Sequence, residues 1–393
     1  MKRREQHILI LCIEYIPSVH VGVVSILENI KKSNAVQIRF VPSFSVTAAY
    51  IEWADIVISV RGYTPRELVV MEYALHCGKY LVYYLDDDLM NNLPENNFSY
   101  SEEVVLMCRD NIPKILSTVN ILWTNSDVIV ANYGVYCQNT IKVIAPAPCL
   151  ATIPQKEKSD VVSIIFAGGL DHSAFLNNLL GECLIEILEK HMGKVRLYVL
   201  GAKPDFANKS KYITMIPYEP DFNKYRQNVI GLQPDIGLAP LPDKNFYHSK
   251  YFNKYLEYAT MGIAGVYSKT LPYTSVVKDK VTGLLADNSP EAWKICVEQL
   301  IADTEMRINI RKNSRTQVDK EFTMQQACAS LLESMPHLVS FRSKKIRSNL
   351  IEKLKFNFQR KTVHSKYVLF LKKYKWKAPS RLCKKLWECF RGS

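Results

Sequence analysis

The chain has 393 residues, of which 48% are hydrophobic, and its formal net charge is +13. That length fits two α/β domains with large cores rather than one ordinary domain. No stretch approaches the roughly 20 consecutive apolar residues that cross a bilayer, which excludes a transmembrane helix. Residues 341–393 hold 17 Lys and Arg but 2 Asp and Glu, so a near-neutral, enzyme-like body carries a strongly basic tail.

The N-terminal sequence MKRREQHILILCIEY places a short apolar run between a basic start and Glu14. A secretory signal would need a longer apolar core and a small-residue cleavage site, so we expect a first buried strand here. The ten cysteines are scattered, with no CxxC pair and no metal-ligand spacing, and most lie in apolar runs. We therefore predict small core residues in a reducing compartment.

Apolar runs alternate with helical patterns through the first half of the chain. The predicted strands read HILILCI, VQIRFVP, DIVISV, YLVYYL, ILWTN and IKVIAP, and the helical patterns between them include residues 21–32, 65–77 and 102–118. Strands that are apolar throughout, with helices between them, indicate a parallel sheet covered on both faces. We predict a Rossmann-like domain over residues 1–145 and a proline-rich, charged linker over 146–160.

The second half repeats this pattern. Its predicted strands read VVSIIFAGG, VRLYVLG, YITMIPY, DIGLAPL and AGVYS, and late helices are predicted over residues 290–302 and 306–318. We therefore predict a second Rossmann-like domain over residues 161–340, followed by the basic helical tail. The fold class is α/β, with two doubly wound domains, and ligands of such sheets bind beyond the carboxyl ends of the strands.

Residues 248–268, HSKYFNKYLEYATMGIAGVYS, combine cations, a carboxylate and a predicted helix start. The free N–H groups and partial positive charge of a helix N-terminus suit a phosphate. Lys250 and Lys254 are four positions apart and are expected to share a helix face. Glu257 could accept hydrogen bonds from paired hydroxyls such as those of a ribose. A surface helix with solvated lysines is the alternative interpretation.

This stretch, with DIGLAPL before it and PYTSVVKDKVTGLLADN and EAW after it, resembles the C-terminal half of group 1 glycosyltransferases of the GT-B fold. The resemblance covers about residues 161–318. Members carry two glutamates eight positions apart, the first near the donor sugar and the second on the ribose. Glu257 matches the second, and Ser249 stands in place of the first. The resemblance implies a nucleotide-sugar site, with His248 and Ser249 as further donor-side candidates.

Gly168 and Gly169 follow the strand VVSIIFA and precede a predicted helix. A glycine pair allows close approach of a phosphate to the backbone, although a tight strand–helix turn would need the same residues. In the resembled family this loop lines the donor pocket, so both are donor-side candidates. The family's common Arg and Lys are absent here, which leaves Lys250 or Lys254 to stabilise the departing diphosphate. Lys254 is therefore a catalytic candidate.

Asp86, Asp87 and Asp88 follow the strand YLVYYL. Adjacent carboxylates repel one another unless they are solvated or partnered. One interpretation is a Mg²⁺ or Mn²⁺ site, since these ions prefer oxygen ligands. Another is an acidic loop at the cleft, because the family often has His-Asp at the position of Asp86-Asp87; a helix cap or loop charge is a third. We favour the second, with Asp86 and Asp87 as catalytic candidates and no obligatory metal or other cofactor.

The acceptor side is less defined by the sequence. His20 and Gly22 follow the first strand, where proteins of the resembled fold shape the acceptor pocket. Arg61, at the end of DIVISV, could meet an anionic acceptor or be an exposed arginine. All three residues are retained as acceptor-side candidates.

The tail over residues 341–393 has an apolar stripe at helical spacing among its basic residues, formed by Ile346, Leu350, Leu354 and Phe358. A basic helix with large apolar residues on one side is typical of a helix that lies on an anionic membrane surface. Packing against the first domain and binding to nucleic acid are the alternatives, of which nucleic acid is the least favoured.

These patterns together predict a glycosyltransferase on the cytoplasmic face of a membrane. It would move a sugar from a nucleotide-sugar donor to a growing, lipid-linked surface glycan, and the resemblance implies retention of the anomeric configuration. Two other interpretations remain. The chain could be a nucleotide-sugar epimerase of the same fold, or a non-catalytic glycan-binding partner of another transferase, which the serine at position 249 favours.

Overall fold

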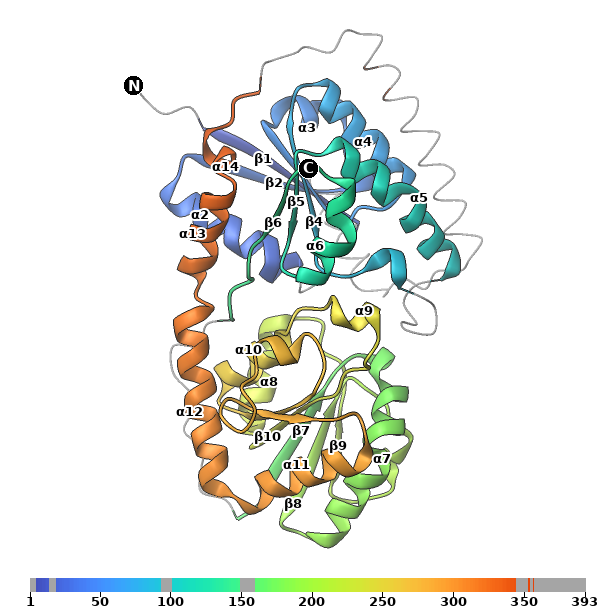
Figure 1. Ribbon diagram of the computed structural model, residues 1–393, viewed down its shortest axis with the longest axis vertical. Coiled ribbons are helices and arrows are strands. Elements are labelled where there is room, and N and C mark those ends of the chain that lie inside the picture. The colour runs from blue at the N-terminus through green and yellow to red at the C-terminus, as the bar shows by residue number, and fades with distance from the viewer. Residues whose placement is uncertain are drawn as a thin grey trace.

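The computed structural model describes residues 5–13, 19–92, 101–148 and 160–343, together with Lys353 and Phe356. Within this part of the chain two lobes are stacked end to end, each built on one six-stranded parallel sheet (Figure 1). The prediction of two tandem α/β domains is therefore confirmed.

The first sheet has the strand order β2-β1-β3-β4-β5-β6. Its strands are β1 (Gln6–Cys12), β2 (Val36–Pro42), β3 (Ile56–Val60), β4 (Tyr80–Leu85), β5 (Ile121–Thr124) and β6 (Thr140–Lys142). Because successive side chains of a strand point to opposite faces, β1 contributes Ile8 and Ile10 to one core and Leu9 and Leu11 to the other. Burial on both faces is what the continuous apolar runs predicted.

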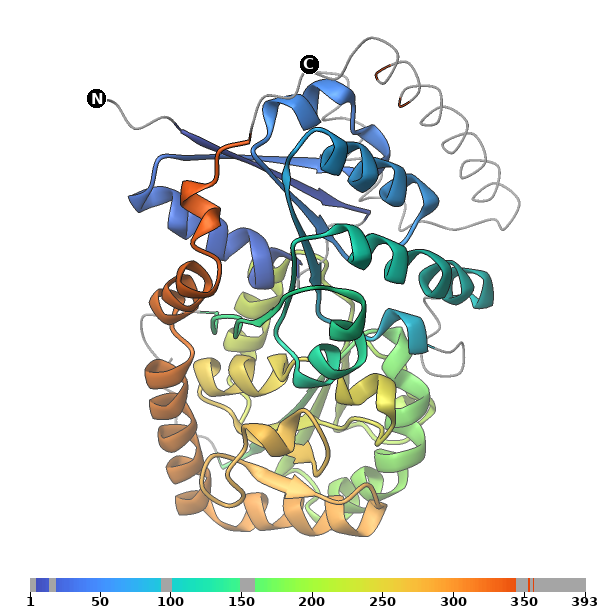
Figure 2. The same ribbon diagram turned by 45° about the horizontal axis from the view of Figure 1, so that its top comes forward.

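Helices cover both faces of the first sheet. They are α2 (Ser25–Ser33), α3 (Ala48–Trp53), α4 (Pro65–His76), α5 (Glu102–Thr118) and α6 (Asp127–Tyr133), with a short π-helix, η1 (His20–Val24), before α2. The helix α2 packs on one face and α3 and α4 on the other (Figure 2). Thr64 begins α4 by accepting a hydrogen bond from the Glu67 N–H, and Pro65 fits the first helical position.

The second sheet has the order β12-β11-β10-β7-β8-β9. Its strands are β7 (Val162–Ala167), β8 (Val195–Leu200), β9 (Ile213–Ile216), β10 (Ile236–Ala239), β11 (Ala264–Ser268) and β12 (Leu284–Ala286). Its helices include α7 (Ser173–Lys190), α8 (Phe222–Leu232), α9 (Asn245–His248), α10 (Asn253–Met261) and α11 (Pro290–Ala302). Five of the strands match predicted ones, and β12 is an edge strand that the sequence analysis missed.

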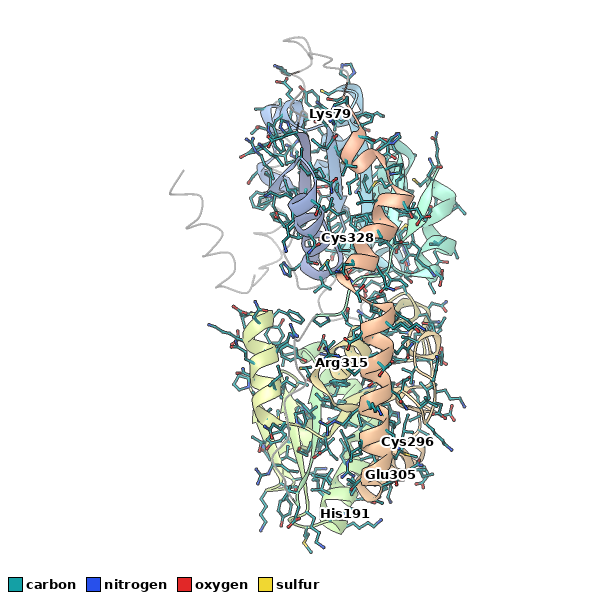
Figure 3. The ribbon with its side chains drawn as sticks, turned by 90° about the vertical axis from the view of Figure 1, so that its left-hand side faces the viewer. Lys79, His191, Cys296, Glu305, Arg315 and Cys328 are labelled. Atoms are coloured by element: carbon teal, nitrogen blue, oxygen red, sulfur yellow. The ribbon has the colours of Figure 1, made fainter. Side chains whose placement is uncertain are left out.

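The last described helices cross from the second domain back to the first. The helix α12 (Thr304–Glu321) packs on the second domain, and α13 (Met324–Ser334) and α14 (His337–Ser340) continue along the first (Figure 3). Leu331 and Met335 are fully buried in the core that also contains α2. The range 161–340 predicted for the second domain thus includes two helices whose apolar faces are buried against the first.

The start of the tail also contacts the first domain. Ser343 donates a hydrogen bond of 3.0 Å to Asp55, and Phe356 is 1% exposed, stacked on Tyr73 with the guanidinium of Arg66 4.9 Å from its ring. The apolar stripe predicted for the tail lies outside the described residues. Searched over the described part of the chain, no helix combines the length and hydropathy that a bilayer crossing requires.

Seven cysteines lie in the described ranges, and all are free thiols. Four of them, Cys12, Cys77, Cys108 and Cys183, are buried. Burial raises the pKa of the Cys108 thiol to about 12, so this side chain is a neutral core group. This agrees with the prediction of structural rather than disulfide-bonded cysteines.

Candidate functional site

A cavity of about 310 Å³ opens at the carboxyl edge of the second sheet. Its lining follows four strands in turn: Gly168 and Gly169 after β7, Gly201 after β8, Pro217 after β9 and Pro240 after β10. The start of α10 closes one side. This is the edge at which doubly wound sheets bind ligands, and the volume is at the lower end of the roughly 300–1,000 Å³ of small-molecule sites.

The glycine pair directly follows β7 and lies beside the end of the neighbouring strand β8. Gly201 has a φ of 79°, and a Cβ atom there would lie 2.4 Å from the carbonyl oxygen of Gly168. Only glycine allows the loops after β7 and β8 to approach so closely. His172, which also lines the cavity, precedes α7. It is the first residue with a basic side chain after the glycine pair, a signal that the sequence analysis passed over.

The helix α10 begins at Asn253, later than predicted. Lys250 therefore lies in the preceding segment and does not share a helix face with Lys254. Both lysines still line the cavity, together with Glu257. The first turn of α10 faces the cavity, and none of the described side chains caps it. The positive end of this helix dipole and the two ammonium groups make this wall suited to an anion, although the N–H groups of Asn253 and Tyr255 already donate to backbone carbonyls.

Glu257 and Lys254 form an ion pair within the cavity wall. Lys254 Nζ lies 2.7 Å from Glu257 Oε2, and the hydroxyl of Tyr225 donates to the same oxygen at 2.9 Å. Burial opposes the charge of Lys254, but the neighbouring Glu257 carboxylate outweighs it and raises the pKa of this lysine. Lys254, predicted to meet the diphosphate, is thus engaged by a carboxylate, and Lys250 is the better placed cation for a phosphate.

Lys250 also reaches across the domain boundary. Its Nζ lies 3.5 Å from Asp87 Oδ1, and Asp87 Oδ2 accepts a hydrogen bond of 2.6 Å from Arg61. Burial disfavours the charge of Asp87, but Lys250 and Arg61 outweigh it and hold the pKa of this carboxyl below its usual value. Asp86 Oδ1 lies 3.5 Å from Arg61 Nε. Asp87 thus contacts the second domain, and neither Asp86 nor Asp87 is among the described residues that line the cavity, so their catalytic role stays a prediction.

Arg61 is not an exposed arginine. Its side chain is 12% exposed, its φ is 54°, and it pairs with both Asp86 and Asp87. A left-handed backbone is unusual for a residue other than glycine, and here it directs the guanidinium at the acidic loop after β4. The side chain therefore holds that loop through two of its carboxylates.

Asp88 points into the first domain. It is fully buried, and its carboxylate accepts hydrogen bonds from Tyr133 at 2.6 Å and from Asn91 and Asn132. Asp86 and Asp87 thus share Arg61, whereas the Asp88 carboxylate faces Tyr133 and two asparagines of the first domain. Across the described ranges, no group of three or more His, Cys, Asp or Glu side chains is arranged to hold a metal ion.

His248 and Ser249 are not among the described residues that line the cavity. Ser249 is fully buried, and its Oγ accepts a hydrogen bond of 3.0 Å from the Asp88 N–H. His248 instead pairs with Asp243 Oδ1 at 2.6 Å. Ser249 therefore belongs to the domain boundary. His248, the last residue of α9, contacts the segment that precedes this helix.

The acceptor-side candidates His20 and Gly22 lie in η1. His20 is exposed, whereas Gly22 is buried against β4. A Cβ atom at Gly22 would lie 2.1 Å from the hydroxyl oxygen of Tyr84. Gly22 therefore allows η1 to pack on the sheet, which gives this residue a structural role.

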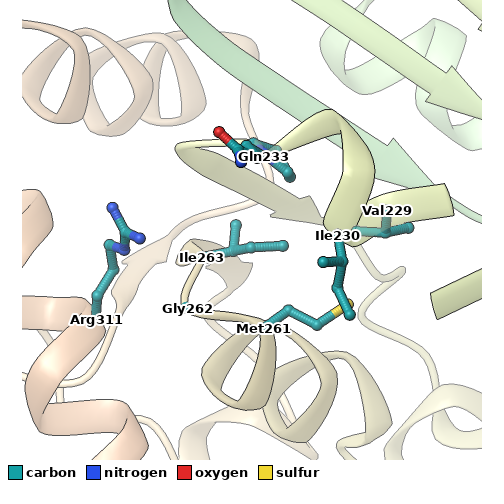
Figure 4. A pocket seen from close by; sticks show the side chains of 8 residues that line it. Val229, Ile230, Gln233, Met261, Gly262, Ile263 and Arg311 are labelled. Atoms are coloured by element: carbon teal, nitrogen blue, oxygen red, sulfur yellow. The ribbon is translucent and has the colours of Figure 1, made fainter. Parts of the chain in front are cut away.

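A second hollow of about 10 Å³ lies at the opposite edge of the second sheet, beside Ile230, Met261 and Arg311 (Figure 4). Space of that size holds about one water molecule. The larger cavity is accordingly the candidate ligand site.

No protein-family model matches the chain, and no curated protein matches its sequence. Solved structures match its fold. Anabaena HepE, in complex with UDP and glucose, is 14% identical with a TM-score of 0.59, over 84% of this chain and 100% of that one. Sucrose-phosphate synthase from Thermosynechococcus elongatus is 11% identical with a TM-score of 0.63, over 85% and 99%.

WaaG, a glycosyltransferase involved in lipopolysaccharide biosynthesis, is 14% identical with a TM-score of 0.58, over 85% of this chain and 99% of that one. These three neighbours have the GT-B fold. At such identities the likeness concerns architecture. With its two parallel sheets and a cavity at the carboxyl edge of the second, the chain has the GT-B fold.

Proposed function

We propose that the chain is a glycosyltransferase that uses a nucleotide-sugar donor. The observation that carries the proposal is the cavity wall formed by Lys250, Lys254 and Glu257 at the carboxyl edge of the second sheet. A carboxylate suits the paired hydroxyls of a ribose, and Lys250 with the first turn of α10 suits a diphosphate. The complexes of HepE with UDP and with UDP-glucose support a uridine nucleotide as the first ligand to test.

In this proposal the chain's own residues bind and neutralise the leaving group. The glycosidic bond of the donor breaks and its electron pair goes to the diphosphate oxygen. The oxygen of an acceptor hydroxyl forms the new bond, and its proton passes to the departing diphosphate. Lys250 and the positive end of the α10 dipole stabilise the charge that develops on the diphosphate. Asp87, whose Oδ1 lies 3.5 Å from Lys250 Nζ across the boundary, positions that lysine from the first domain.

The test is a panel of UDP-, GDP-, ADP- and CDP-sugars and their nucleoside diphosphates, scored by thermal stabilisation of the full chain. A ligand at 100 times its Kd stabilises the folded state by about 2.7 kcal/mol, a readily measured increase in Tm. We expect one nucleotide class to stabilise the protein and its sugar form to be consumed when a glycan acceptor is added. Absence of stabilisation by every member would refute the proposal.

The acceptor we propose is a lipid-linked glycan at the inner face of a membrane, with the donor's anomeric configuration retained in the product. The basic tail over residues 341–393 supports the membrane, since anionic lipid attracts each nearby basic residue by about 1 kcal/mol. The anomeric proton coupling in the product tests retention, and transfer to polyprenyl-linked against free oligosaccharide tests the lipid.

A second candidate is a nucleotide-binding partner without transferase activity. Ser249 favours it, because this residue is buried at the boundary and holds Asp88 in place of contacting the cavity. Donor binding without any release of nucleoside diphosphate, with or without acceptor, would favour this candidate. Appearance of an epimeric donor sugar would instead identify an epimerase.

A further inference from the structure

Three polar side chains from two helices meet on one wall of the cavity. Tyr225, on the first turn of α8, donates its hydroxyl to Glu257 Oε2 at 2.9 Å. Lys254, on α10, donates to the same oxygen at 2.7 Å and to the Tyr225 hydroxyl at 3.0 Å. All three residues line the cavity. The three side chains form a closed triangle of hydrogen bonds, in which Glu257 Oε2 accepts one bond from Tyr225 and one from Lys254.

The position of Tyr225 follows from how α8 begins. Asp221 caps that helix, and its carboxylate accepts hydrogen bonds from the N–H groups of Asn223 and Lys224. The cap fixes the first turn at the carboxyl edge of the sheet, where the cavity opens. The Tyr225 ring lies 6.1 Å from Phe222 and 5.0 Å from the ammonium of Lys254, which restricts its rotation.

The protonation states suit these hydrogen bonds. Burial, and then the negative charge of Glu257, raises the pKa of the Tyr225 phenol well above its usual value, so the hydroxyl remains a donor at neutral pH. Lys254 keeps its charge for the reason given above. Glu257 therefore faces two donors on Oε2, and its other oxygen is left for a ligand.

We propose that Tyr225 is a positioning residue that orients the Glu257 carboxylate toward the two hydroxyls of the donor ribose. This inference rests on the proposed function. The terminal torsion of a glutamate is broad, and Lys254 reaches Glu257 through a flexible chain, so one flexible partner alone fixes the carboxylate plane poorly. The rigid phenol supplies the second anchor, and preorganisation of this kind lowers the cost of binding.

The test compares UDP with 2′,3′-dideoxy-UDP by calorimetry in wild-type protein and in Tyr225→Phe, which keeps the ring. We expect wild-type protein to favour UDP by at least about tenfold, as a diol bonded to a charged group should. In Tyr225→Phe, UDP affinity should fall about tenfold while dideoxy-UDP affinity stays within about twofold. Tyr212→Phe, outside the cavity and before β9, is the matched control and should keep the wild-type ratio.

A double variant separates positioning from a general effect on the fold. Because Tyr225 acts through Glu257, Tyr225→Phe should change UDP affinity little when Glu257 is already Ala, so that the two losses are not additive. Additive losses, or an unchanged preference for UDP over dideoxy-UDP in Tyr225→Phe, would overturn the inference.

The nucleoside diphosphates of the other three bases, each with its dideoxy analogue, extend the same comparison if UDP does not bind. Wild-type binding of a nucleotide with no preference for its ribose form refutes the role of Tyr225 and leaves the nucleotide site intact. Failure of all four bases refutes the proposed function and the inference with it.

Discussion

Ser249 and Asp88 lie 161 positions apart in the chain and meet across the boundary between the two domains. Ser249 Oγ accepts a hydrogen bond of 3.0 Å from the Asp88 N–H and donates one of 2.7 Å to the Phe246 carbonyl. The resembled family has a donor-side glutamate at this position. In this chain the residue is fully buried and joins the domains.

Ser249→Glu, which restores the family residue, should therefore destabilise the protein. The new carboxylate would be buried beside the acidic loop of Asp87 and Asp88, without a cation assigned to it. We expect the free energy of unfolding to fall by about 3 kcal/mol, which corresponds to a Tm lower by about 4 °C for a chain of this length. Thermal unfolding measures this, with the exposed Ser117→Glu as control. A stable variant with increased turnover would contradict the structural role.

Glu257→Ala should weaken nucleoside diphosphate binding without unfolding the protein. Lost hydrogen bonds to a charged group cost about 1.5–3 kcal/mol, so Kd should rise about 10- to 150-fold. Glu305→Ala, an exposed glutamate on α12 (Figure 3), is the control and should bind as wild type. Calorimetry decides, and unchanged affinity in Glu257→Ala would remove Glu257 from the site.

Asp87 should make the domain contact sensitive to acid. Its folded-state pKa lies below the usual value of 3.8, so its ion pairs contribute stability that is present above that pH and lost as the pH falls through the lowered value. Wild-type Tm should therefore fall more steeply than that of Asp87→Asn below about pH 4. Asp110→Asn, at an exposed position of α5, should follow wild type. Parallel curves for wild type and Asp87→Asn would show that these ion pairs add no stability.

Turnover should survive removal of divalent ions. Arg61, Lys250 and Tyr133 already partner the acidic loop, which leaves its carboxylates engaged by the protein itself. We expect nucleoside diphosphate release from the donor to continue in excess chelator, and Asp87→Asn to lower turnover more than donor affinity. Complete loss of activity that Mg²⁺ or Mn²⁺ restores would establish a metal site.

The tail should divide into a structural part and a membrane-binding part. Phe356→Ala should cost about 3–5 kcal/mol of stability, because the ring is buried in the first core. Removal of residues 361–393, which carry 10 Lys or Arg and 1 Glu, should keep Tm and nucleotide binding. The shortened chain should lose salt-sensitive sedimentation with phosphatidylserine vesicles. Equal sedimentation of both chains would place membrane binding elsewhere.

Much of the architecture could be predicted from the sequence because it depends on local pattern. The runs YLVYYL and AGVYS became β4 and β11 with the predicted bounds, since a strand buried on both faces is largely apolar, and VQIRFVP became β2, a half-exposed edge strand in which polar and apolar residues alternate at Gln37 and Arg39. The short strand β12 carries too few residues for that signal. The return of α13 to the first domain depends on which apolar face finds a partner, and no local pattern specifies that partner.

The candidate site was predictable only in part. Glu257 and the glycine pair could be identified because they stand at motif positions next to strand ends. The pairing of Lys254 with Tyr225 joins residues 29 positions apart, and that of Lys250 with Asp87 joins residues 163 positions apart. Such pairings arise from tertiary packing. The same holds for Ser249, whose burial could not be read from a serine in a polar segment.

The chain passes between the domains twice, and a hydrogen bond ties the two passages together. The Ala147 N–H, on the way out of the first domain, donates to the carbonyl of Phe322, on the way back, at 2.8 Å. This bond joins the two crossings on the side of the molecule where α12 and α13 lie. Ser249 directly follows α9, and α9 lies at the opposite end of the domain boundary from α12 and α13 (Figure 1). A small rotation of one domain about the Ala147–Phe322 hydrogen bond would therefore break the contact between Ser249 and Asp88 before it broke that bond.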